Sequence, residues 1–172
     1  MVRSFITYPF QFFFFVLVQV LVLNNMQFSS MINPYLYIIF LLWLPIETPK
    51  WFLLAVAFVL GIAVDMFTNT MGMHASACIF LAFCRPFILG LMAPRDGYEP
   101  NQKPGIKDFG IAWFVTYATI LTLLHHLFLF YVEVFRFENF FSTLARVFAS
   151  TLFTLVLIVI SQYFRYNAED RS

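Results

Sequence analysis

The sequence predicts an all-α polytopic membrane protein, folded as a single transmembrane domain over residues 1–172. The first observation is composition: 62% of the residues are hydrophobic and 11% are charged, whereas about 25% of the residues in a soluble domain are charged. The second is that apolar runs long enough to cross a hydrocarbon core recur along the chain, with polar turns between them. The net charge of +1 provides no basic surface for nucleic acid, so no nucleic-acid partner is expected.

The apolar runs predict six transmembrane helices, of which the second is short. The first run, Phe5 to Leu23, is about 28 Å long as a helix and spans a bilayer core. The second run, Tyr35 to Leu44, is about 15 Å long and lies between Pro34 and Pro45, so it is either a short helix or a re-entrant segment. The predicted helices are residues 5–23, 34–46, 51–67, 74–92, 109–130 and 140–164, with a hydrophilic loop at 93–108.

The positive charges predict the orientation of the helices. With six crossings and the N-terminus inside, the cytoplasmic segments carry most of the cations, as the positive-inside rule requires. If residues 35–44 do not cross, five spans remain and the N-terminus lies outside. We favour six crossings, with both termini in the cytoplasm. The cytoplasmic cations are then Arg3, Lys50, Arg95, Lys103, Lys107, Arg165 and Arg171, against Arg136 and Arg146 on the outer side.

Asp65 is the first candidate for a functional residue, because it lies within an apolar run. An intramembrane carboxylate costs about 2.5–3.5 kcal/mol on insertion scales and marks a functional site by default. Gly61 precedes it by one helical turn and allows a neighbouring helix to approach the same face. The alternative is that Asp65 lies near the outer helix end, where it is hydrated or caps the turn.

Arg85 is an obvious partner for Asp65, but the expected depths differ. Arg85 lies about 16 Å deeper than His74 along an antiparallel helix, so we expect it to snorkel inward or to bind carbonyl groups freed by Pro86. Arg146 is better placed, near the outer end of the last helix. The hypothesis is an outer polar cluster of Asp65, Asn69, His74, His125 and Arg146.

The motifs of common enzymes and cofactor sites are not found in the sequence. It contains no zinc-protease HExxH, no GxSxG and no phosphate-binding loop. His125 and His126 are adjacent, so on a helix they project roughly 100° apart, which does not suit one metal ion. We therefore predict no catalytic, cofactor or metal site.

The central hairpin carries a family resemblance. Gly61 and Asp65 stand in G-I-A-V-D, and after the turn Gly72, His74 and Ala75 stand in G-M-H-A. With its length and its six apolar runs, the chain resembles MreD, the rod shape-determining membrane protein family of bacteria. The resemblance implies a non-enzymatic scaffold in the bacterial cytoplasmic membrane that binds MreC. It also implies a cell-elongation complex with the RodA glycosyltransferase, its penicillin-binding transpeptidase and, indirectly, the MreB filament.

The same family is similar in fold to the substrate-binding subunits of energy-coupling vitamin transporters, which supplies the alternative function. In that case the outer cluster, with Trp43, Asn69 and His74, binds a vitamin-like solute. A coupling subunit also needs a docking surface of the Ala-x-x-x-Ala type, which the first apolar run lacks, so we favour the scaffold. Its Phe- and Leu-rich lipid-facing surfaces are then expected to bind a partner helix, and loop 93–108 to contact cytoplasmic partners.

Overall fold

The structure of the chain is a computed structural model that describes residues 2–26, 32–99, 102–134 and 140–169. Every regular element in these ranges is helical, as the sequence predicted. Five described segments are long and apolar enough to cross a membrane, so the chain is a multi-pass membrane protein. They are α1 (Val2–Leu17) with its continuations η1 (Val18–Val22) and η2 (Leu23–Asn25), α3 (Lys50–Thr68), α4 (Met73–Leu91), α5 (Ile106–Val134) and α6 (Phe140–Glu169).

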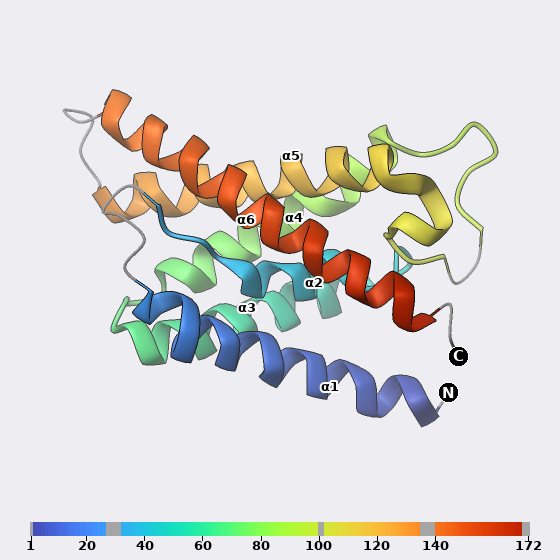
Figure 1. Ribbon diagram of the computed structural model, residues 1–172, viewed down its shortest axis with the longest axis horizontal. Coiled ribbons are helices and arrows are strands. Elements are labelled where there is room, and N and C mark those ends of the chain that lie inside the picture. Colours follow the sequence, from blue (N-terminus) through green and yellow to red (C-terminus); the bar gives the residue numbers. More distant parts are fainter. Residues whose placement is uncertain (1, 27–31, 100–101, 135–139, 170–172) are drawn as a thin grey trace.

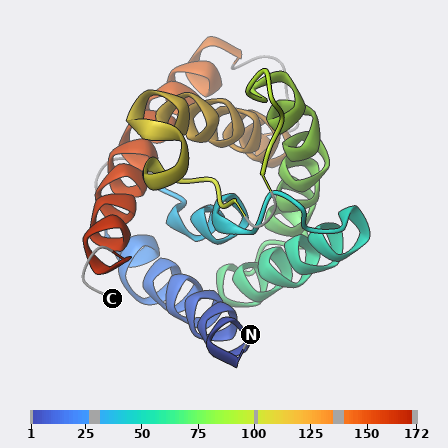
Figure 2. The ribbon, with the colours of Figure 1, turned by 90° about the vertical axis from the view of Figure 1, so that its right-hand side faces the viewer.

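The long helices surround a short one. Seen along the bundle, α1, α3, α4, α5 and α6 form a ring, and the short helices η3 (Leu36–Ile38) and α2 (Ile39–Trp43) lie inside it (Figure 2). Residues 33–35 before η3 are not helical and run inward from one end of the bundle (Figure 1). Five side chains of the short segment are fully buried: Tyr37, Ile38, Ile39, Leu41 and Leu42. The second apolar run is therefore the centre of the hydrophobic core.

Both chain termini lie at the same end of the bundle (Figure 1). We call it the termini end; it also carries the segment 92–105 between α4 and α5. The opposite end, called the far end, carries the turn between α3 and α4. Segment 92–105 is shorter than the expected loop 93–108, because residues 106–109 form a helical turn before the kink at Gly110, whose φ is 81°.

Aromatic side chains attach segment 92–105 to the bundle. The hydroxyl of Tyr98 donates to the Leu89 carbonyl at 2.7 Å, and the indole of Trp113 donates to the Met92 carbonyl at 3.0 Å. The Tyr98 ring packs edge-on against Phe109 and Trp113. Partial burial raises the pKa of the Tyr98 phenol above its ordinary value, which keeps it a hydrogen-bond donor. The connection is therefore held close to the helix ends.

Helices α3 and α4 approach each other closely at Gly61. A Cβ atom added to Gly61 would lie 2.7 Å from the carbonyl carbon of His74 and still closer to the backbone of Ala75. Real Cβ atoms do not approach backbone atoms so closely, so only glycine fits here. The expectation that Gly61 admits a neighbouring helix is confirmed, and the neighbour is the first turn of α4.

Replacing Gly61 by alanine is expected to lower the melting temperature of the purified protein in detergent. The added methyl group forces α3 and α4 apart, at a cost of about 1–3 kcal/mol. The matched control is Gly90→Ala in α4, where an added Cβ meets nothing within 4 Å and helix propensity favours alanine. Equal melting temperatures for the two variants would contradict the close contact.

Candidate functional site

The carboxylate of Asp65 binds the first turn of α4. Its two oxygens accept hydrogen bonds from the backbone N–H groups of His74 at 3.0 Å and Ala75 at 2.9 Å, and from the hydroxyl of Thr70 at 2.6 Å. The first N–H groups of a helix have no partner within it, and the helix dipole favours negative charge there. Asp65 is buried, so of the roles considered for it the structure shows turn capping, supplied by the preceding helix.

All three histidines of the chain gather beneath the far end. The hydroxyl of Tyr37, from the short helix, lies 3.0 Å from Nδ1 of His74 on α4 and 2.9 Å from Nε2 of His125 on α5. A phenol has a single hydrogen to donate, so one imidazole must donate to Tyr37 while the other accepts. The Tyr37 hydroxyl thereby connects the short helix, α4 and α5 in the buried interior.

His126 belongs to a second chain of hydrogen bonds that reaches α6. Its Nδ1 lies 2.8 Å from the Thr122 carbonyl, which accepts, so this nitrogen carries the proton. Its Nε2 therefore accepts from the hydroxyl of Thr154 at 3.3 Å. The same hydroxyl accepts from the backbone N–H of Tyr35 at 3.1 Å. The adjacent histidines thus serve two separate networks, rather than one site.

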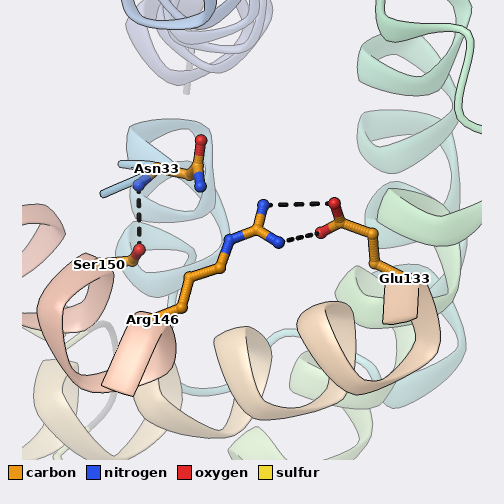
Figure 3. Close-up of polar contacts among 4 residues, drawn as sticks. All are labelled: Asn33, Glu133, Arg146 and Ser150. Atoms are coloured by element: carbon orange, nitrogen blue, oxygen red, sulfur yellow. Dashed lines mark hydrogen bonds and ion pairs between the residues drawn. The ribbon is translucent and has the colours of Figure 1, made fainter. Parts of the chain in front are cut away.

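Arg146 joins three segments at the far end (Figure 3). Its guanidinium forms an ion pair of 3.1 Å with Glu133 near the end of α5. The side-chain amide of Asn33 is oriented so that its oxygen faces the donors of Arg146. This oxygen accepts from Arg146 Nε at 2.9 Å and from Nη2 at 3.0 Å. The guanidinium also lies 4.3 Å from the ring centre of Phe130, a cation–π distance. The backbone N–H of Asn33 donates to Ser150 at 3.0 Å, so α6 binds Asn33 through two side chains.

A cavity of about 660 Å³ opens at the far end above these networks. Volumes of this size hold small molecules in other proteins. Part of its wall is polar or aromatic, including Tyr35 and His74. Another part is apolar, including Leu23, Met26 and Leu129. Glu133 and Arg146 also line it, so the cavity contains one ion pair.

Arg85, on α4, binds the backbone at the end of the short helix nearer the termini end. Its guanidinium donates to the Leu44 carbonyl, to the Pro45 carbonyl at 3.4 and 3.5 Å, and to the hydroxyl of Tyr117 at 2.8 Å. Tyr117 in turn donates to the Leu42 carbonyl at 3.2 Å. The expectation that Arg85 snorkels or uses carbonyls beside Pro86 is wrong. The side chain is 1% exposed, because the last carbonyls of the short helix need donors within an apolar interior.

The predicted outer cluster is divided in the structure. The junction of α3, α4 and α5 contains Asp65, His74 and His125. Asp65 binds the α4 backbone there, whereas Arg146 binds Glu133 and does not contact Asp65. Asn69 is exposed and ends α3 in a left-handed conformation with φ 55°, so it takes no part. Gly72 also has positive φ, 78°, just before α4. Trp43, predicted for a solute site, lies beneath Arg165 at 4.8 Å, away from the cavity. Arg136 lies outside the described residues.

Six side chains that organise the site were not predicted from the sequence. Hydroxyl and phenol groups within apolar runs gave no signal, because such groups are common in membrane helices. Gln19, within the first apolar run, is also fully buried. The residues that were not predicted are Asn33, Tyr37, Tyr117, Glu133, Ser150 and Thr154.

Comparisons of the chain with protein-family models, with curated proteins and with solved structures give no match.

The substitution Asp65→Asn is expected to destabilise the purified protein by about 1–2 kcal/mol. The amide keeps one acceptor oxygen, but its NH2 group would face a backbone N–H and the charge at the helix start is lost. The measurement is the melting temperature in detergent, with exposed Glu47→Gln as the control for losing one carboxylate. An unchanged melting temperature for Asp65→Asn would refute the capping role.

The substitution Arg85→Lys is expected to cost about 1–3 kcal/mol, because an ammonium cannot reach Tyr117 and the two carbonyls together. Limited proteolysis and thermal unfolding in detergent would report the loss. Arg95→Lys, at an exposed position in segment 92–105, is the matched control. Wild-type behaviour of Arg85→Lys would show that the short helix does not depend on the guanidinium.

Proposed function

We propose that this chain is a non-enzymatic membrane scaffold of the MreD kind. One observation carries the proposal: the residues that make the chain resemble that family form contacts between helices. Gly61 and Ala75 form a close contact between α3 and α4, Asp65 caps α4, and His74 binds Tyr37. Each of these residues holds helices together. This use is typical of a protein whose rigid shape is what its partners recognise.

The proposal extends to topology. Residues 33–43 run from the far end toward the termini end inside the ring (Figure 1), which supports counting them as a sixth, partly extended crossing. Five described cations support a cytoplasmic termini end under the positive-inside rule: Lys50, Arg95, Lys103, Lys107 and Arg165. Arg146 is at the far end. The membrane is then the bacterial cytoplasmic membrane, with both termini inside.

The proposed partners are those that the resemblance implies. The first spanning segment and helix α6 present long rows of exposed apolar side chains. They include Phe10, Phe13, Phe14 and Leu17 on α1, Leu21 on η1, and Phe148, Leu152, Val156 and Ile160 on α6. A single-span partner such as MreC binds such a surface by close packing. RodA and its penicillin-binding transpeptidase join the same complex, and segment 92–105 is available to partners on the MreB side.

One observation favours the alternative function, the solute-binding subunit of an energy-coupling transporter. The cavity of about 660 Å³ at the far end is a suitable size for a vitamin-like molecule, and polar groups converge on it. Under this alternative the partners are a pair of ATPases and a coupling membrane subunit, rather than cell-wall synthases.

The test is purification of the tagged protein at native expression level in a mild detergent, followed by mass spectrometry. The scaffold proposal expects a single-span MreC-like protein together with a glycosyltransferase and a transpeptidase. The Gly61→Ala variant is expected to recover less of this complex than Gly90→Ala at equal expression, because it distorts the α3–α4 hairpin. Recovery of paired ATPases with a coupling subunit would replace the scaffold proposal with the alternative.

A further inference from the structure

The cavity at the far end combines features that the scaffold function does not use. It is open, and an ion pair between Arg146 and Glu133 lies in its wall. Both charged side chains are partly accessible, at 21% for Arg146 and 38% for Glu133. Because accessible charges on a concave surface can exchange an internal partner for a ligand, the pair can act as a recognition element.

The charge balance of the wall restricts the chemistry of a ligand. Among the described residues that line the cavity, Arg146 and Glu133 are the charged groups and their charges cancel, with His74 as a further polar group. A ligand with a single charge would pair with one partner and leave the other without compensation, which is costly in a partly desolvated site. A ligand that carries both charges can satisfy Arg146 and Glu133 together.

The two partners are held differently. Arg146 is fixed by Asn33 and by the ring of Phe130, so its guanidinium is in place before a ligand arrives. Glu133 is the more exposed partner and lies next to the last residue of α5. We expect Glu133 to turn from Arg146 toward an incoming ammonium group. Arg146 is then free to bind the anionic group of the ligand with a forked pair of hydrogen bonds.

The apolar part of the wall indicates the remainder of the ligand. Leu23, Met26, Met73 and Leu129 line the cavity beside the ion pair, and burying apolar ligand surface against them stabilises a complex by about 25 cal/mol per Å² before the costs of association. A suitable ligand therefore has a short zwitterionic head and an apolar body.

We propose that the cavity at the far end binds a zwitterion with an apolar body, its anionic group on Arg146 and its ammonium group on Glu133. Two sources share this chemistry: the phosphoethanolamine head of a phospholipid and a free amino acid with an apolar side chain. The site lies outside the contacts assigned to the scaffold, and the inference does not depend on which proteins bind the chain.

The experiment uses the full chain purified in detergent. Native mass spectrometry with phosphatidylethanolamine, compared with phosphatidylglycerol, tests the lipid source. Titration calorimetry with L-leucine tests the amino-acid source, with N-acetyl-leucine and leucine methyl ester as analogues that each keep one charge. Zwitterion binding by either source, stronger than its comparators by at least about tenfold, is the expected result, and the arm that responds identifies the source.

Variants separate recognition from folding. Glu133→Gln is expected to weaken binding of the zwitterion by about tenfold or more, whereas Glu47→Gln, outside the cavity, leaves it unchanged. The proposal is overturned if neither zwitterion binds, if analogues with one charge bind equally well, or if Glu133→Gln binds like the wild type at the same melting temperature.

Discussion

The structure depends on one constraint. A non-helical backbone inside an apolar bundle needs a hydrogen-bond partner for each N–H and C=O group that is not paired within a helix. Residues 33–36 meet this constraint through side chains. Gln19 donates to the Pro34 carbonyl at 3.0 Å and accepts from the Leu36 N–H at 2.8 Å. Ser150 and Thr154 accept from the N–H groups of Asn33 and Tyr35. At the other end of the segment, Arg85 and Tyr117 bind its last carbonyls. The polar residues of the surrounding helices are therefore placed where this short segment needs them.

The local irregularity of the first helix has the same cause. Gln19 lies in η1, a π-helical stretch within an otherwise α-helical span. A π-turn shifts the register of the side chains that follow it and is often found where a side chain has a special role. Here the side chain turned inward is the one that clamps residues 34–36. The α3–α4 hairpin follows a related rule, because Asp65 supplies the acceptor that the first turn of α4 lacks.

The sequence predicted the parts of the fold that hydropathy determines. The long apolar runs gave the spanning helices, and the spacing of Gly61 and Asp65 gave the face that α4 contacts. The partners of Arg85 could not be predicted, because depth along a helix does not reveal that a short central segment ends beside it. Arg146 was predicted to join Asp65, but it binds Asn33 and Glu133, which lie in separate segments with no common pattern. Pairings across the bundle depend on the route of residues 33–43, which no local signal describes.

That route also connects the cavity to the other end of the molecule. Asn33 binds Arg146 in the cavity wall, and Tyr35 lines the cavity. Further along the same segment, Trp43 lies beneath Arg165 and the Leu44 carbonyl binds Arg85. A ligand that takes the place of Glu133 on Arg146 binds a residue that also holds this segment in place. Residues 36–44 of this segment are buried, and a close-packed interior does not deform continuously. One chain segment therefore links the cavity wall to the carbonyls that Arg85 binds.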